Sequence, residues 1–233
     1  MDLRETGLVD PGRHWYYLSK YVAISRAARR SMSAATALVD VGAGSGYFAS
    51  KLIEDGTVVS AWCVDPFYDE GQLGNRGSIH YVRSLSPEDS SRASLYLFID
   101  VLEHVDDDRK LLRDYVAPAA KGTVLVITVP AFQSLWSGHD VFLGHRRRYR
   151  LSTVVALVQA EGLRVVERRY LFGVLLPVAW IRRRRANARE SRSDLQPTSR
   201  WLNMLLRVVC SIEHRLPTNR LGGLSAMVVA IKD

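Results

Sequence analysis

The chain has 233 residues, of which 47% are hydrophobic and 24% are charged, a balance typical of an ordinary globular domain with one substantial core. The net charge is +8, and almost all of the positive charge is arginine, whose planar fork suits phosphate and carboxylate partners, although a GC-rich genome produces the same bias. Cys63 and Cys210 share no metal-like spacing, so we expect no disulfide framework, no metal and a reducing compartment.

The N-terminal segment contains no apolar core of a secretory signal, which favours a cytoplasmic protein. Residues 13–33, which begin RHWYYLSKY, predict one helix or a helix pair with aromatic and basic faces. No apolar run in the chain reaches the roughly 18–20 residues that are needed to cross a bilayer.

The segment TALVDVGAGSG (36–46) predicts a short apolar strand that ends in a glycine-rich turn. A helix over 47–56 follows, with Gly56 as its stop signal. Glycines at such a turn let the chain bend sharply and let a ligand approach the backbone closely. A dinucleotide fingerprint would need a glycine where Tyr47 stands, so an NAD-dependent dehydrogenase is disfavoured.

The remaining elements alternate between strands and helices. One helix is predicted over 101–116, with acidic residues in its first turn and Pro118 beyond its end. Another is predicted over 152–162, with Ser152 as N-cap and Gly162 as stop. Strands are predicted over 57–65, 78–84, 93–100, 122–130, 163–171 and 224–233.

This alternation predicts an α/β doubly wound fold, with a mostly parallel sheet that helices cover on both faces. We expect one domain with three parts: an N-terminal helical segment (1–33), a core (34–171 plus 222–233) and a helical insertion (172–221).

The insertion combines an apolar stretch, YLFGVLLPVAWI (170–181), with the arginines that follow it. Residues 182–199 are typical of a solvated linker, and 199–216 has apolar residues at helical spacing, which predicts a helix packed on the N-terminal segment. Residues 170–185 could form a lid, a dimer contact or a peripheral contact with anionic membrane lipids at the inner membrane face. The chain is predicted to be a monomer or a homodimer.

Three motifs point to one enzyme family. VDVGAGSG, with Asp40 two residues before Gly42, resembles motif I of class I S-adenosylmethionine-dependent methyltransferases. Asp65 ends the second predicted strand, where an acid can bind both hydroxyls of a ribose, and IDVLEHV (99–105) resembles the signature that follows strand four in small-molecule members. HWYY and VPAFQSLWSGHDVFLGHRRRY resemble a type 11/12-like branch of bacterial lipid, glycan or natural-product pathways, with Tyr16 and Asp100 as conservative departures.

The resemblance implies a Rossmann-like seven-stranded sheet with an antiparallel last strand, and S-adenosyl-L-methionine as the cofactor, with S-adenosyl-L-homocysteine as the product. By position in these motifs, it implies that the methionine part of the cofactor would be contacted by Asp40, Gly42, Ala43, Gly44 and Gly46, and the ribose by Asp65. The adenine would be contacted by Pro66, Phe67, Ser84 and Leu85. The inner end of the pocket would be closed by Ile99 and Asp100.

The cluster GHDVFLGHRRRYR (138–150) follows the strand at 122–130, at the sheet edge where doubly wound folds bind ligands. Methyl transfer requires alignment of the acceptor and, for a hydroxyl acceptor, removal of a proton, for which histidine is suited near neutral pH. His139, next to Asp140, is the first candidate base, His145 the second and His104 the third. The candidate acceptor contacts are Asp140, Arg148, Tyr149, His14 and Trp15, with Arg146, Arg147 and Arg150 as further candidates for gripping an anionic acceptor. A solvated charged loop, with catalysis by proximity alone, is the alternative.

These observations predict transfer of a methyl group to a small-molecule acceptor, lipid-linked, sugar-linked or a natural product, at an oxygen atom. An RNA methyltransferase is one alternative, which the lack of an RNA-binding module and of an Asn/Asp-Pro-Pro-aromatic motif after 93–100 disfavours. A non-catalytic, cofactor-binding partner subunit is the other.

Overall fold

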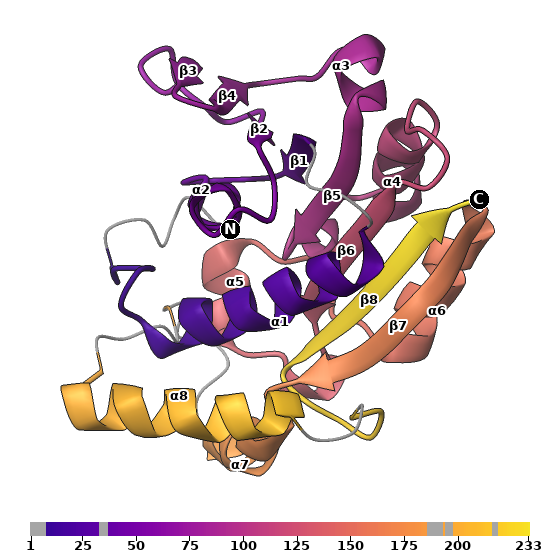
Figure 1. The fold of residues 1–233 in the computed structure, drawn as a ribbon. Coiled ribbons are helices and arrows are strands. Elements are labelled where there is room, and N and C mark those ends of the chain that lie inside the picture. Colours follow the sequence, from indigo (N-terminus) through magenta and orange to yellow (C-terminus); the bar gives the residue numbers. More distant parts are fainter. Residues whose placement is uncertain (1–7, 33–36, 186–192, 194–197, 216–218) are drawn as a thin grey trace.

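A computed structural model describes residues 8–32, 37–185, 193, 198–215 and 219–233 and contains one eight-stranded sheet (Figure 1). The strand order is β3-β4-β2-β1-β5-β6-β8-β7. The strands are β1 (Ala37–Val41), β2 (Ser60–Val64), β3 (Gly74–Arg76), β4 (Ile79–Val82), β5 (Ala93–Ile99), β6 (Val124–Pro130), β7 (Leu163–Leu171) and β8 (Ser225–Lys232).

The sheet confirms the predicted fold class. Strands β4, β2, β1, β5 and β6 are parallel, and β8 is antiparallel to both β6 and β7. The additional strand, β3, pairs with β4 in antiparallel register. Its three residues are all exposed and carry no apolar alternation, so the sequence offered no pattern that could predict it.

Helices cover both faces of this sheet. The α-helices are α1 (Trp15–Ser31), α2 (Tyr47–Glu54), α3 (Pro87–Ser91), α4 (Asp108–Val116), α5 (Gly138–Leu143), α6 (Leu151–Ala160), α7 (Leu176–Arg185) and α8 (Arg200–Arg215). Short 3-10 turns are η2 (Leu102–His104), η3 (Gln133–Leu135) and η4 (Gly173–Leu175).

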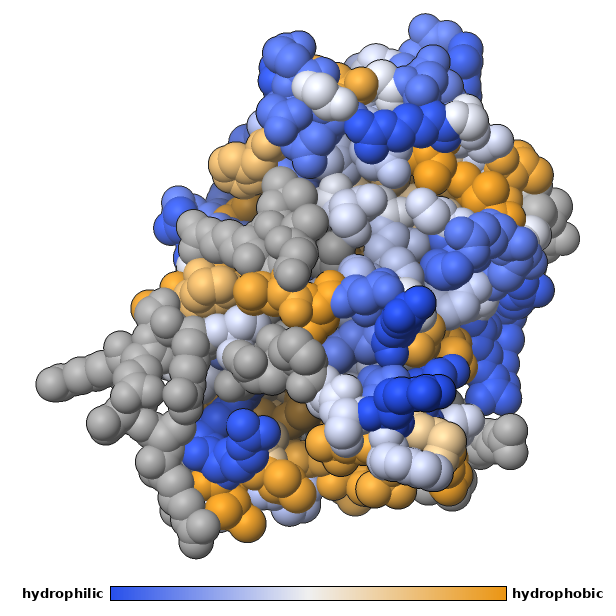
Figure 2. All heavy atoms as spheres, turned by 90° about the vertical axis from the view of Figure 1, so that its left-hand side faces the viewer, coloured by the Kyte–Doolittle hydropathy of each residue, from blue (hydrophilic) through white to orange (hydrophobic). Residues whose placement is uncertain are grey.

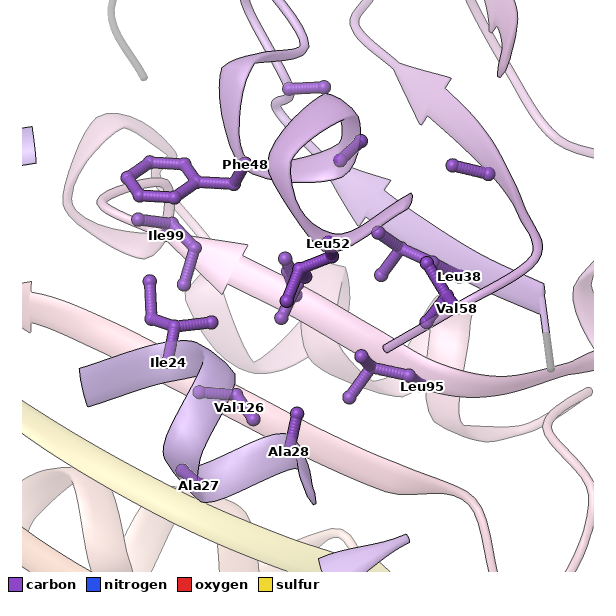
Figure 3. Packing of buried hydrophobic residues seen from close by; sticks show 14 of the residues in the cluster. Ile24, Ala27, Ala28, Leu38, Phe48, Leu52, Val58, Leu95, Ile99 and Val126 are labelled. Carbon is purple, nitrogen blue, oxygen red and sulfur yellow. The ribbon is translucent and has the colours of Figure 1, made fainter. Parts of the chain in front are cut away.

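Successive strand residues point to opposite faces, so each strand contributes to two cores. Leu38 of β1 packs with Ile24 of α1 and Leu52 of α2 on one face (Figure 3). Val39, the next residue, packs with Leu112 of α4 and the apolar side of α6 on the other face. Burying one such side chain stabilises the folded state by about 1.5–3 kcal/mol. Packing on both faces therefore holds the strands in place, and with them the sheet edge on which the site lies.

Two predicted helix boundaries were wrong. The predicted helix over 101–116 is interrupted: η2 comes first, and α4 begins only at Asp108, because the Asp107 side chain accepts a hydrogen bond from the Lys110 N–H and caps the helix there. Helix α6 begins at Leu151 with Arg150 as its N-cap, whereas Ser152 was expected to cap it.

The N-terminal segment forms a single helix, α1, and the insertion forms α7 and α8, with α8 lying along α1 (Figure 1). The prediction that the helix over 199–216 packs on the N-terminal segment is confirmed, but much of its apolar stripe does not take part in that contact. Cys210 and Glu213 face inward, whereas Trp201, Leu205 and Ile212 are exposed. Most of the predicted linker at 182–199 lies outside the described residues. Within the described part of the chain, no helix combines the length and apolarity needed to span a membrane.

Candidate cofactor cavity and acceptor loop

A cavity of about 850 Å³ lies at the carboxyl ends of β1, β2, β4 and β5. In this sheet the strand order reverses on either side of β1, which is where doubly wound folds bind their ligands. The volume falls in the range of small-molecule sites, roughly 300–1,000 Å³. The cavity lining includes Gly42, Asp65, Pro66, Phe67, Ser84, Leu85, Asp100, Val101, His104 and Arg146.

The turn between β1 and α2 requires glycine. Gly42 and Gly46 have φ angles of +65° and +71°, which residues with a Cβ rarely adopt. A Cβ at Gly42 would lie 2.7 Å from Val101 Cγ2, and one at Gly46 would lie 2.6 Å from the Tyr81 hydroxyl. Both glycines are therefore needed for the close packing of this turn, and Gly42 lines the cavity.

Asp65 connects this turn to the loop after β2. Its side chain is buried, with Oδ2 accepting a hydrogen bond from the Gly44 N–H at 3.1 Å and Oδ1 accepting one from the Phe67 N–H at 3.0 Å. These two bonds fix the carboxylate at the cavity wall, where its remaining lone pairs can accept from two neighbouring hydroxyl groups. The Phe67 ring is 82% exposed and offers a flat apolar face beside it.

Asp40 lies on β1, two residues before the turn, and does not line the cavity. It is buried, and within the described residues its Oδ2 atom has no hydrogen-bond partner. Burial raises the pKa of Asp40 to about 7. An orphaned buried carboxylate oxygen is costly, so this position favours a cationic group nearby.

Asp100 lines the inner end of the cavity and contacts α1. Its carboxylate pairs with Lys20, whose side chain is fully buried, and accepts from the Tyr16 hydroxyl at 3.2 Å and the Thr128 hydroxyl at 3.0 Å. Burial alone would raise the pKa of Asp100, but Lys20 outweighs it and holds that pKa below its usual value. The sequence analysis missed Lys20; its spacing of four from Tyr16 places both on one helix face, which is the signal that could have found it.

Not every predicted cofactor residue reaches the cavity. Ser84 and Leu85, after β4, and Pro66 line it. Ile99 does not: its side chain packs in the core between the sheet, α1 and α2 (Figure 3). Val101, two residues later, lines the cavity in its place.

The acceptor loop, residues 138–150, begins with α5, which the sequence analysis treated as a loop. A capping box in which the Asp140 carboxylate accepts from the Ser137 N–H at 2.8 Å starts this helix. The other oxygen of Asp140 contacts His145 Nδ1 at 2.9 Å and Arg148 Nε at 2.6 Å. Asp140 therefore orients His145, which lies five residues later in the chain, and not only the adjacent His139 that the sequence suggested.

His145 belongs to a cluster next to the cavity. Its Nε2 atom lies 3.9 Å from Glu103 Oε1, and its ring centroid lies 4.8 Å from that of His104, which lines the cavity. The centroid of His139 is farther away, at 6.3 Å. Glu103 is fully buried, and burial raises its pKa well above the usual range. The sequence analysis did not assign Glu103 a role of its own.

Two arginines of the acceptor loop, Arg146 and Arg147, bind the segment 102–108. Arg146 Nε donates to the His104 carbonyl at 2.8 Å and Arg147 donates to the Val105 carbonyl at 3.0 Å. Arg148, expected at the acceptor, is buried against Asp140 and donates to the Ala131 carbonyl at 3.1 Å. Of the arginines in this loop, Arg146 alone lines the cavity.

Tyr149, His14 and Trp15 also lie away from the cavity. The Tyr149 hydroxyl is buried and donates to the Leu102 carbonyl, 3.1 Å away. His14 is buried as the N-cap of α1, and the Trp15 N–H donates to Asn203 of α8 at 2.7 Å. These expected acceptor residues therefore position the acceptor loop and α1.

Removing Asp140 should destabilise the fold more than any surface charge does. Burial alone would raise its pKa, but the hydrogen bond from His145 and the charge of Arg148 outweigh it and hold that pKa well below the usual range. Asp140→Ala leaves the buried Arg148 guanidinium unpaired, so we expect a loss of about 3–5 kcal/mol in the free energy of unfolding. Urea unfolding checks this, with Glu70→Ala, which breaks an exposed ion pair with Arg83, as a control expected to lose less than about 1 kcal/mol. Equal losses would contradict the buried pairing.

Comparison with known proteins agrees with this geometry. A model of the methyltransferase domain matches residues 14–168, about two thirds of the chain. No curated protein matches the chain. Among solved structures, a complex between the Haloferax volcanii Trm112 methyltransferase activator and a methyltransferase is similar, with 15% identity, a TM-score of 0.57 and coverage of 98% of this chain and 92% of that chain.

Two further structures have the same fold. A methyltransferase structure from Bacillus halodurans has 14% identity and a TM-score of 0.55 over 92% of this chain and 98% of that one. A SAM-dependent methyltransferase from Archaeoglobus fulgidus has 15% identity and a TM-score of 0.52, with 91% and 94% covered. With the family model spanning more than half of its residues, the chain belongs to the methyltransferase domain family, and its fold is that of the class I, S-adenosylmethionine-dependent enzymes.

Proposed function

We propose that the chain transfers the methyl group of S-adenosylmethionine to an oxygen atom of a small-molecule acceptor. The observation that carries the proposal is the Asp65 carboxylate, held between the glycine turn and Phe67 at the point where the strand order reverses. Asp65 would bind the ribose hydroxyls, Phe67 and Leu85 would flank the adenine, and the backbone from Gly42 to Gly44 would face the methionine part. When bound, the cofactor supplies an electrophilic methyl group on a sulfonium.

On the acceptor side, the histidines beside the cavity would take the proton of a hydroxyl acceptor. Asp140 holds His145 Nδ1, which leaves Nε2 as the acceptor in the neutral ring. His104 lines the cavity wall and would contact the acceptor directly. We therefore rank His145 and His104 above His139 as proton acceptors.

The test is transfer of a labelled methyl group from S-adenosylmethionine into extracts of hydroxylated small molecules, lipid-linked sugars and total RNA, each offered separately. Label in a small-molecule or lipid product supports the proposal where alkali releases it as methanol, from an ester, or hydriodic acid releases it as iodomethane, from an ether, because a methyl group on carbon is released by neither and one on nitrogen only under harsher conditions. Label in RNA would contradict it. Cofactor binding without label in any fraction would favour the non-catalytic alternative.

Asp40 should couple cofactor binding to pH. Its pKa of about 7 means that it carries a proton below pH 7, and a cationic cofactor group nearby favours the ionised form. Binding of S-adenosylhomocysteine should therefore release a proton at pH 6, and affinity should rise with pH, by at most about tenfold per unit, until it levels near pH 7. Calorimetry in two buffers of different ionisation enthalpy measures this release. Asp40→Asn should abolish it, and a wild type whose binding is independent of pH would refute the coupling.

The acceptor is proposed to be membrane-associated, because α8 presents an apolar stripe to the surface. Its exposed members, spaced on one helix face, are Trp201, Met204, Leu205, Val208 and Ile212. Hydrophobic residues gather in the lower part of Figure 2, where α7 and α8 lie. The described exposed charges on these two helices, Arg182, Arg200 and Arg207, are all positive. The buried Glu213 instead accepts from the Gly173 N–H at 2.9 Å. An apolar stripe among cations fits an anionic lipid surface.

Liposome sedimentation tests this contact. Wild-type protein should bind vesicles that contain anionic lipid, and Leu205→Glu should weaken binding at least tenfold, because it places a charge in the apolar stripe. Val166→Glu is the matched control, since Val166 is an equally apolar, exposed residue on β7. Equal effects of the two substitutions, or binding to neutral vesicles alone, would refute the anionic surface.

A further inference from the structure

A second feature beside the cavity is a cluster of three groups that suits a metal ion: Glu103, His104 and His145. One ligand atom from each lies within 4.8 Å of the others. Ligand atoms around one ion lie about 2.0–2.2 Å from it, so an adjustment on the order of 1 Å brings these three onto a common centre. Glu103 and His104 come from η2, and His145 follows α5, so the cluster joins the two segments that border the acceptor side of the cavity.

The surroundings of Glu103 independently indicate that this cluster binds a ligand. The residue has no exposed surface, and within the described part of the chain neither of its carboxylate oxygens has a hydrogen-bond partner. Its oxygen Oε1 lies 3.9 Å from His145 Nε2, beyond hydrogen-bond distance. Such a buried carboxylate is costly unless a proton or a cation compensates it.

Asp140 adds the support that metal-binding histidines need. It contacts Nδ1 of His145 at 2.9 Å and thereby directs Nε2 of that ring toward Glu103. A carboxylate on the far nitrogen of a ligating histidine fixes the ring and raises its basicity. Arg148 neutralises the negative charge of Asp140, so the pair can remain buried without an ion.

We propose that Glu103, His104 and His145 bind a first-row divalent cation, such as Zn²⁺, Mn²⁺ or Fe²⁺. Two imidazoles and one carboxylate select this class over Mg²⁺ and Ca²⁺, which prefer oxygen ligands alone. The inference departs from the expectation, based on cysteine spacing, that the chain binds no metal. It changes the role proposed for His145 from proton acceptor to ligand.

The proposal deepens the acceptor chemistry and to that extent rests on the proposed function. Three protein ligands leave positions on the ion open, and His104 places the ion at the cavity wall. An acceptor with two adjacent oxygens, such as a catechol or an α-hydroxy acid, would fill two of these positions. The ion would favour ionisation of the hydroxyl that is to be methylated.

The experiment is direct titration of chelator-treated full-length protein with Zn²⁺, Mn²⁺ and, as a spectroscopic probe, Co²⁺. We expect one equivalent to bind, with the visible absorption of Co²⁺ bound to nitrogen ligands. Glu103→Gln, which keeps the shape of the side chain, and His145→Gln should each weaken binding at least tenfold. His80→Gln, on the far strand β4, should leave it unchanged. Circular dichroism checks the fold of each variant.

The outcomes separate the two proposals. Wild-type protein that binds no ion, or binding that survives Glu103→Gln, overturns the metal site, and S-adenosylhomocysteine titration of the same sample then shows whether the proposed function still stands. Failure to bind S-adenosylhomocysteine overturns the proposed function even if an ion binds. Equal loss in the His80 variant would identify adventitious surface histidine binding.

Discussion

Asp65→Ala is expected to weaken binding of S-adenosylhomocysteine at least about 100-fold. The carboxylate would accept two hydrogen bonds from the ribose, and each bond to a charged group contributes about 1.5–3 kcal/mol. The substitution also removes the acceptors of the Gly44 and Phe67 N–H groups, which loosens the turn that approaches the cofactor. Calorimetric titration of folded protein measures the loss.

Asp69→Ala is the matched control for this prediction. Asp69 is exposed in the same loop, and its carboxylate accepts from the Gln72 N–H, so its loss should change affinity less than about twofold. The affinity of Asp65→Asn should lie between those of the wild type and Asp65→Ala, because an amide oxygen still accepts hydrogen bonds but carries no charge. Wild-type affinity in Asp65→Ala would show that the ribose binds elsewhere. Binding of NAD in place of S-adenosylhomocysteine would overturn the cofactor assignment.

The residues that sequence analysis could predict are those whose role depends on backbone position. Gly42, Gly46 and Asp65 follow strands that the apolar pattern reveals, and parallel strands bring their carboxyl ends to one edge of the sheet. Neither inference needs a side-chain direction. The glycine turn and the acid after β2 could therefore be located in the sequence, and the resemblance to class I methyltransferases implied their roles.

The acceptor loop could not be predicted in the same way, because its contacts depend on where a short helix turns. Asp140 is adjacent to His139 in sequence, but as the third residue of α5 it caps the helix and meets His145, five residues later. The capping box Ser-x-x-Asp was visible in the sequence and could have revealed the helix. The partners of Arg146 and Arg147 lie about forty residues earlier, in 102–108, and no local pattern marks them.

Helix α8 shows a different limit of sequence reasoning. Apolar residues at helical spacing predict an amphipathic helix but not which side meets the protein. In α8 the interior side carries Asn203, which accepts from Trp15, and Glu213, which caps the turn at Gly173. Cys210 also packs into the core on this side, so α8 carries apolar residues on both faces. An apolar stripe that stays exposed is expected for a surface that binds something else.

His145→Gln is expected to lower kcat by about 10²–10⁴-fold while leaving S-adenosylhomocysteine affinity within about twofold of wild type. His145 lies beside the cavity, oriented by Asp140, and touches neither Asp65 nor the glycine turn, so its loss should affect the acceptor side alone. The measurement is methyl transfer to the acceptor found by labelling, with substrate at saturation.

His139→Gln is the matched control, since it changes the same residue type six positions earlier in the same loop. Its kcat should fall less than about threefold, because Asp140 is directed toward His145 instead. Equal loss in both variants would indicate that the loop as a whole, and not one histidine, supports the reaction. Full activity in His145→Gln would mean that transfer proceeds by alignment alone. In that case the buried Asp140–Arg148 pair would serve only to hold the loop against the segment at Ala131.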